Sequence, residues 1–241
     1  DEAVMMAEKL KNVPILTGAD RFQTGRYALK NYEIDTLILD DGFQHLALRR
    51  DLDILLCDHQ RPLGNNYLFP AGELREPARE TRRADMVCFT RYSGGPVKFS
   101  PKYLGLIPQI KTHLRLDSII NMENGDVCDA EVLKGQPVIA FCGIAKPEGF
   151  RQILQDVQVQ LKMFKAFPDH HEYSLNDVKE LESIASQEGV KYILVSEKDA
   201  VKLKGMKFSL PFFKVVIDLE ILEGREIFNK KITTTTSHRG N

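Results

Sequence analysis

Two adjacent carboxylates, Asp40 and Asp41, directly follow an aliphatic run at residues 36–39. Such a run is typical of a buried parallel strand, and ligands of open α/β sheets bind at the edge where these strands end. Neighbouring carboxylates repel each other unless a proton or a cation relieves them, so the pair predicts a divalent metal site. The alternative is a strand that ends in a polar turn without a ligand, since Asp-Gly is common in turns.

The residues after the two acids add further donors to this predicted site. Gly42 permits a sharp turn, after which Gln44 contributes an amide and His45 an imidazole. We predict that Asp40, Asp41 and Gln44 face a metal ion and that His45 reaches bound phosphate. The alternative for His45 is an ordinary polar residue at the start of a helix.

A second chemical group is the sequence Asp169-His170-His171, which follows the apolar residues Phe164 and Phe167. Its place at the end of a predicted element is where binding and catalytic residues concentrate. A carboxylate beside an imidazole orients the ring and tunes its pKa, which suits acid–base catalysis. A zinc site on both histidines is disfavoured, because adjacent residues of an extended segment point in opposite directions. The alternative is a surface turn without a catalytic role.

Basic residues that could hold phosphate occur at two places. A guanidinium binds phosphate in a bidentate manner, and a local basic cluster consists of Arg75, Arg79, Arg82 and Arg83. Acidic residues are interspersed with it, so Arg79, Arg82 and Arg83 fit a solvated, internally paired surface. Lys198 and Lys202 share one helix face at i,i+4 spacing, facing either phosphate or solvent.

Strand-like and helix-like segments alternate along the chain, which predicts an α/β fold with parallel strands and helical crossovers. The predicted strands are residues 13–16, 36–39, 52–57, 86–90, 137–142, 192–195 and 212–217. The predicted helical segments are residues 3–10, 25–30, 79–83, 150–161, 174–188 and the stretch from Lys198 onward. Ser174 and Asp177 have the spacing of a capping box, Gly189 closes the same helix, and residues 233–236 are expected to fray.

A hairpin-like segment divides the chain into two predicted domains. Residues 113–120 and 127–133 could pair around Asn124-Gly125, a strong hairpin dipeptide. We therefore predict a core domain at residues 1–112, a hairpin-like linker at residues 113–136 and a smaller α/β domain at residues 137–241.

Composition excludes several classes of protein. The formal net charge is −1, so nothing indicates binding to nucleic acid. No apolar run approaches the roughly 20 residues that a membrane-spanning helix needs. The four cysteines have no metal-ligand spacing and are expected to be reduced core residues.

Six ordered motifs resemble those of the tetraacyldisaccharide 4'-kinases, the lipid A kinases of Gram-negative bacteria. They are Asp1-Glu2, Asp40-Asp41-Gly42-Phe43-Gln44-His45, the segment at residues 68–77, Gly143-Ile144-Ala145-Lys146-Pro147-Glu148, Phe167-Pro168-Asp169-His170-His171 and the segment at residues 196–202. The matches run from the first residue to about Lys202. Six motifs in the same order carry more weight than any one of them.

The resemblance implies a P-loop-kinase-like parallel sheet and a second, smaller α/β domain. It also implies phosphorylation of the 4'-hydroxyl of a tetraacyl glucosamine disaccharide 1-phosphate, with ATP and Mg²⁺. The lipid substrate places such an enzyme peripherally on the cytoplasmic face of the inner membrane. Asp1 becomes the candidate general base with His170 as its partner, although an acid at a helix start needs no function. Glu2 is implied in the metal shell, and Arg75 and Lys198 in substrate binding.

One part of the family pattern is absent from these residues. The sequence Gly-x-x-x-x-Gly-Lys-Ser/Thr, which cradles the phosphates of ATP, does not occur, and Gly25 is followed by Arg26 where that pattern needs a lysine. We expect a chain without the family's amino-terminal segment, with an incomplete first sheet and little or no activity alone. The alternatives are a non-catalytic remnant that binds lipid or metal, and a metal-dependent sugar transferase.

Overall fold

The computed structural model describes residues 2–99 and 101–237, and these form two compact units. Unit 1 combines residues 1–15 with residues 115–218, and unit 2 combines residues 16–114 with residues 219–241. Both units are discontinuous because strands β3 (Gln109–Asn121) and β8 (Phe212–Glu223) each contribute residues to both. This division differs from the predicted one, which assigned the amino-terminal helix and residues 16–112 to the same domain.

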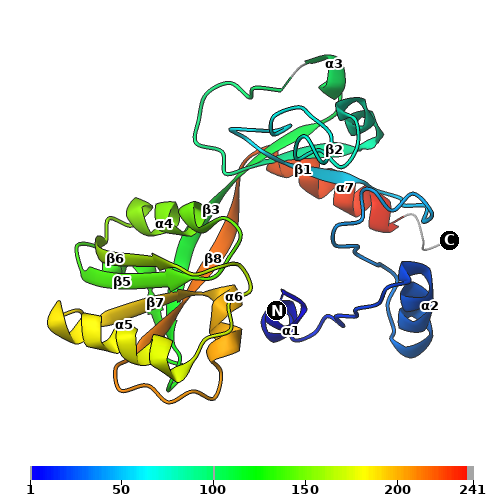
Figure 1. Cartoon of the computed structure of the whole chain (residues 1–241). Helices are drawn as coiled ribbons and strands as arrows, with labels where there is room; N and C mark the ends of the chain where they lie inside the picture. Colours follow the sequence, from blue (N-terminus) through cyan, green and yellow to red (C-terminus); the bar gives the residue numbers. More distant parts are fainter. Residues whose placement is uncertain (1, 100, 238–241) are drawn as a thin grey trace. The chain divides into compact units, whose positions relative to one another are not determined.

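Unit 1 is an α/β unit built on parallel strands. Within it the strand order is β3-β8-β7-β5-β6, with β5 (Pro137–Cys142), β6 (Gln160–Ala166) and β7 (Tyr192–Ser196). The pairs β5–β6, β5–β7 and β7–β8 are parallel. Helices α4 (Pro147–Asp156) and α5 (Leu175–Gln187) lie on opposite sides of these strands (Figure 1).

The predicted hairpin is present at the margin of this sheet. Strand β4 (Val127–Asp129) pairs antiparallel with residues 118–120 of β3. Gly125 adopts a φ of 78°, a conformation that is readily accessible to glycine. After β4, the 3₁₀ helix η2 (Ala130–Leu133) takes the place of the second half of the predicted strand.

The core of unit 1 forms where β5, β7 and β8 pack against α5. Buried apolar residues of this cluster include Ile139, Phe141, Leu181, Ile193, Val195 and Phe212. Helix α5 begins at the predicted capping box: the Asp177 amide donates to Ser174 Oγ, and the Ser174 amide donates to Asp177 Oδ2. Gly189 follows with a φ of 64°, as expected of a helix-ending glycine.

Unit 2 contains the parallel strands β1 (Ile54–Asp58) and β2 (Met86–Thr90), with β2 pairing with the first part of β3. Its core includes Val87, Phe89, Phe99 and Leu104. Partly buried Phe228 of α7 (Arg225–Ser237) packs against a second cluster formed by Met86, Cys88 and Ile110. The other helical elements are α2 (Arg21–Asn31), η1 (Ala78–Arg83) and the short α3 (Pro101–Leu104).

Two strands predicted in the first 40 residues are wrong. Residues 13–16 and 36–39 are not strands, and Ile38 is 90% exposed. A strand needs a neighbour that satisfies its backbone hydrogen-bonding groups, and none of the described strands pairs with either segment. Strand β1 ends the strand order beside β2, and its residue Leu56 is 65% exposed.

Two predictions about helices are also wrong. The helix predicted at residues 150–161 ends at Asp156, and β6 begins at Gln160, where exposed and partly buried side chains start to alternate. The tail predicted to fray is the last part of α7, in which the hydroxyls of Thr235 and Thr236 donate to Lys231 O and Ile232 O. None of the helices in the described part of the chain has the length and apolar character needed to cross a membrane.

Candidate functional site

Three sequence motifs meet where the parallel strands of unit 1 end. Strand β5 leads into Gly143, β6 into residues 167–171, and β7 into the short helix α6 (Glu197–Ala200) with the 3₁₀ turn η3 (Val201–Leu203). The carboxyl ends of parallel strands lie at the same edge of a sheet, so the topology brings these motifs together.

Helix α1 (Glu2–Lys9) packs beside this edge through charged and apolar side chains. Lys9 Nζ lies 3.7 Å from Glu197 Oε2, and Lys204 Nζ lies 3.1 Å from Glu8 Oε1. None of the described α1 residues is fully buried, and partly buried Met5 lines a pocket together with Ile120 and Val216. The start of α1 is therefore part of the same unit as His170, whereas the sequence analysis placed the two in different domains.

Lys198 links the start of α1 to the histidine motif. Its Nζ lies 3.7 Å from Glu2 Oε1 and 3.5 Å from Asp169 Oδ1. Partial desolvation raises the pKa of Asp169, but the charges of Lys198 and His170, with hydrogen bonds from both, outweigh it and lower the pKa below its ordinary value. Asp1, the predicted general base, lies outside the described residues.

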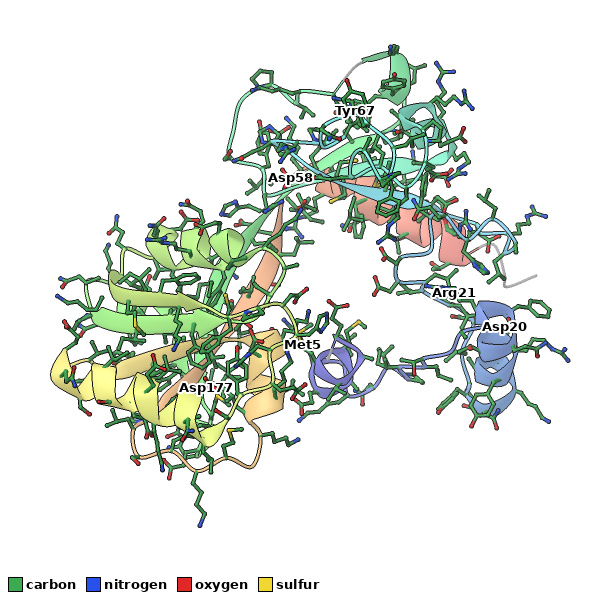
Figure 2. The ribbon with its side chains drawn as sticks, viewed as in Figure 1. Met5, Asp20, Arg21, Asp58, Tyr67 and Asp177 are labelled. Atoms are coloured by element: carbon green, nitrogen blue, oxygen red, sulfur yellow. The ribbon has the colours of Figure 1, made fainter. Side chains whose placement is uncertain are left out.

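The two histidines of the motif have different environments. His170 has a φ of 59°, its amide donates to Gly143 O at 3.2 Å, and its exposed ring lies 3.7 Å from Asp169 Oδ2. His171 stacks on the Phe167 ring at a centroid distance of 4.5 Å, and its Nε2 lies 3.4 Å from Asp177 Oδ2. His171 is thus fixed by packing, and His170 is the one that presents its ring to solvent. Figure 2 labels Asp177 near the start of α5.

A buried polar network beneath this edge was missed by the sequence analysis. Asp199 is fully buried and accepts hydrogen bonds from the Gly143 amide at 2.8 Å and from Ser196 Oγ at 2.5 Å. Lys202 Nζ lies 3.7 Å from Asp199 Oδ1 and donates to His171 O at 3.1 Å. The Lys202 side chain is only 4% exposed, so the lysine is neither a solvated residue nor one that faces an open phosphate site.

This network also affects two neighbouring titratable groups. Burial and then the Asp199 charge raise the pKa of Cys142 to about 12. The same two causes, in the same order, raise the pKa of Tyr173 well above its ordinary value. Both groups therefore stay protonated at neutral pH. The pattern Ser-x-x-Asp at residues 196–199 was the available signal, because Ser196 Oγ accepts from the Asp199 amide as in a helix cap.

The acidic motif lies in unit 2, beside the Leu-Arg-Glu-Pro segment. Asp41 has a φ of 52°, and its Oδ2 lies 3.3 Å from Arg75 Nη1. Gln44 Nε2 donates to Glu76 Oε1 at 3.2 Å. The structure thus connects Asp41 and Gln44 with the neighbouring residues Arg75 and Glu76, but on a turn rather than at the end of a strand.

Arg83 contacts both the turn that carries Asp41 and Gln44 and the neighbouring Glu76. Its Nη2 lies 2.7 Å from Glu76 Oε1 and donates to Phe43 O at 3.3 Å, and its guanidinium lies over the Phe43 ring. The predicted internal pairing of the arginine cluster is therefore present for Arg83, and also for Arg79, which pairs with Glu80 at 3.2 Å. Arg75 is exposed and pairs with Asp41 of the acidic motif.

The predicted metal ligands are only partly assembled. In the described part of the chain, no group of three or more His, Cys, Asp or Glu side chains is close enough to hold a metal ion. Asp40 and Asp41 nevertheless present two exposed carboxylates, and Mg²⁺ in kinases commonly takes one or two carboxylates with phosphates and water. The donor set therefore fits a nucleotide-bound Mg²⁺, whereas Glu2 belongs to the other unit.

Known proteins similar to this chain have one activity in their names. The protein of Syntrophus aciditrophicus named tetraacyldisaccharide 4'-kinase is 38% identical over 242 residues, which cover 92% of this chain and 63% of the relative. The protein of the same name from Geobacter sulfurreducens is also 38% identical, covering 92% of this chain and 62% of the relative. The chain thus spans less than two thirds of the length of these relatives.

The fold of this chain is similar to that of a solved structure. LpxK from Aquifex aeolicus, crystallised in complex with ATP, matches 98% of this chain and 68% of its own with a TM-score of 0.75 and 31% identity. This likeness confirms the predicted α/β, P-loop-kinase-like fold class. The model of the family described as tetraacyldisaccharide-1-P 4'-kinase matches residues 1–236. The chain therefore belongs to the tetraacyldisaccharide-1-P 4'-kinase family.

Proposed function

We propose that a protein carrying these 241 residues phosphorylates the 4'-hydroxyl of a tetraacyl glucosamine disaccharide 1-phosphate in lipid A biosynthesis, with ATP as the donor. Family membership supports the reaction class. The structural observation that carries the proposal is the position of Lys198 between Glu2 and Asp169. Two motifs far apart in the sequence converge there on one cation at a sheet edge, which is where ligands of α/β folds bind.

In this proposal Asp1 and His170 act as a catalytic pair. Asp1 accepts the proton of the sugar 4'-hydroxyl, and His170 orients the Asp1 carboxylate and stabilises its charge. The support for this pair is that Glu2 and Asp169, the sequence neighbours of the two residues, share Lys198 as an ionic partner. The exposed ring of His170 is available for such a role, whereas the ring of His171 is packed against Phe167.

We assign the metal to Asp40 and Asp41, with Gln44 as a direct or water-mediated ligand. Mg²⁺ held by these carboxylates would supply positive charge to the phosphates of ATP during transfer. The contribution of this chain is a pair of exposed carboxylates on a turn that Arg83 and Glu76 hold in place. The charge of Arg75 keeps the site from being purely acidic before ligand binds.

In unit 2 we assign Arg75 and His45 to binding of the phosphorylated substrate, and in unit 1 Lys198 is a further candidate for contact with phosphate. Arg75 is 67% exposed and pairs with Asp41, which is 72% exposed, so solvent screens this contact strongly. Such a weak pair is easily exchanged for the stronger bidentate contact between a guanidinium and a phosphate group. Lys198 would compensate the added negative charge near Asp169.

We also propose that the protein binds peripherally to the cytoplasmic face of the inner membrane, where its lipid substrate would reside. Helix α2 supports this proposal, since Phe22, Tyr27 and Leu29 are all exposed beside the basic residues Arg26 and Lys30. Figure 2 labels Asp20 and Arg21 at the start of this helix. Exposed aromatic and basic side chains together are typical of binding to an anionic lipid surface.

Phosphate transfer from labelled ATP to the tetraacyl disaccharide 1-phosphate tests the kinase proposal. We expect no transfer by the 241-residue polypeptide alone, because its sequence has no phosphate-cradling Gly-Lys-Ser/Thr loop. We expect transfer after fusion with the part of the Syntrophus aciditrophicus relative that the match does not cover. A fusion protein that binds ATP but leaves the disaccharide unmodified would contradict the proposal. Turnover by the polypeptide alone would show that the nucleotide site is misassigned.

A further inference from the structure

Asp199 and Lys202 form an ion pair that is almost completely removed from solvent. Their side chains are 0% and 4% exposed, and Lys202 Nζ lies 3.7 Å from Asp199 Oδ1. Desolvating two charges is costly, and replacing buried ion pairs by apolar residues often leaves proteins equally stable or more stable. The pair is therefore poorly explained as a source of stability.

Each member of the pair holds a different loop of the sheet edge. Asp199 Oδ2 accepts from the Gly143 amide at 2.8 Å, which fixes the turn after β5. Lys202 Nζ donates to His171 O at 3.1 Å, which fixes the loop after β6. Ser196, at the end of β7, donates its hydroxyl to the same carboxylate at 2.5 Å. One buried pair thus connects the ends of three parallel strands.

The two loops also contact each other directly beside His170. The His170 amide donates to Gly143 O at 3.2 Å. A Cβ atom at Gly143 would lie 3.0 Å from Pro168 O and 3.2 Å from His171 Cβ, so a side chain there would require the loop to move by a few tenths of an ångström. His170 itself has a φ of 59°, which is unfavourable for a residue with a side chain and needs support from surrounding contacts.

We propose that Asp199 and Lys202 are positioning residues that hold His170 in its left-handed conformation through the Gly143 turn and the His171 carbonyl. An effect of this ion pair on catalysis rests on the proposed catalytic role of His170. The effect of the pair on the conformation of His170 does not depend on that role. If the pair acts in this way, its removal loosens residues 168–171 while the strands beneath remain folded.

Hydrogen exchange of individual amides in the 241-residue chain tests the positioning. The double variant Asp199→Asn/Lys202→Met removes both charges together, so it leaves no uncompensated buried ion, and Asn can still accept from Gly143. We expect the His170 amide to exchange about tenfold faster or more, with little change at Ala140 in β5 and Leu194 in β7. Lys179→Met, the same lysine substitution at an exposed position of α5, is the matched control. It should leave the exchange rates of the His170, His171, Ala140 and Leu194 amides unchanged.

Two results would overturn the proposal. Equal acceleration at His170, Ala140 and Leu194 would show that the pair supports only the global stability of unit 1. Unchanged exchange at His170 would show that the loop is held by other contacts. Lys202→Arg provides a rescue test, because a retained cation should keep His170 protected better than Lys202→Met does.

Kinetics of the fusion protein separate this proposal from the proposed function. We expect the double variant to lower kcat about tenfold or more while KM for ATP stays unchanged, since neither residue contacts nucleotide in the proposed site. Faster exchange at His170 with an undiminished kcat would uphold the positioning and contradict the catalytic role of His170. Unchanged exchange with a reduced kcat would contradict the positioning alone.

Discussion

The two motif clusters of this chain differ in how completely their charges are paired and buried. At the sheet edge of unit 1, Asp199 and Lys202 are hidden from solvent and bonded to backbone groups of two loops. In unit 2, Asp41 and Arg75 form a single exposed contact at 3.3 Å. Buried charges must be paired in one arrangement, whereas exposed charges can change partners at little cost. The first cluster is therefore suited to fixing a geometry, and the second to exchanging a protein partner for a ligand.

The largest expected effect is on stability, and it separates the two clusters. Lys202→Met leaves the Asp199 carboxylate buried without its cation and should lower the free energy of unfolding by about 3–5 kcal/mol. Arg75→Met removes only an exposed contact and should lower it by about 0–1 kcal/mol. Urea denaturation followed by circular dichroism measures both values. If Lys202→Met and Arg75→Met lower the free energy of unfolding equally, the proposed difference between the buried and the exposed cluster is wrong.

A comparable effect on activity is expected at the exposed cluster. In the fusion protein, Asp41→Ala should lower turnover about a hundredfold or more. The variant lacks a carboxylate proposed to hold the metal, so the charge that develops on the phosphates is less well stabilised. The circular dichroism spectrum and melting temperature should stay close to those of the parent. Glu33→Ala, at an exposed acid of the same unit, is the control. Near-normal turnover of Asp41→Ala at ordinary magnesium concentrations would contradict the metal assignment.

The proposed catalytic pair should show non-additive losses. Asp1→Ala and His170→Ala should each lower kcat of the fusion protein about a hundredfold. The double variant should be scarcely worse than the poorer single variant, because residues that act as one unit lose their function together. Affinity for ATP should not change in any of the three. Fully multiplicative losses would show that the two residues act independently.

A smaller effect is expected at the start of α5. Ser174→Ala removes the side-chain cap and should cost about 1 kcal/mol of stability. Desolvation raises the pKa of Asp177, but hydrogen bonds from Ser174 and the contact with His171 outweigh it and lower the pKa below its ordinary value. The stability that this lowered pKa provides is fully present when the pH lies above the ordinary pKa of an aspartate. It is lost as the pH falls through the lower pKa of Asp177 in the folded protein. Asp177→Asn should flatten that acid-side loss in denaturation measured between about pH 5 and pH 2.

Some elements were predictable from the sequence because their determinants are local. The apolar runs of β2 and β5 were placed correctly to the residue, and the Ser174–Asp177 capping box and the Asn124-Gly125 hairpin also formed as expected. The order of the motifs also indicated the family, which the comparisons confirm. Predictions failed where a segment's state depends on a distant partner. Residues 36–39 have the composition of a strand but pair with none of the described strands.

The sequence by itself determined the family and the α/β class, because these follow from motif order and local periodicity. Only the tertiary structure decided that α1 packs in the same unit as His170 and that Lys202 is buried against Asp199. Helical spacing put Lys198 and Lys202 on one face but could not show that one contacts exposed acids and the other lies beneath the sheet edge. Burial depends on which distant segments pack over a residue, and this is fixed only when β5, β6 and β7 end side by side.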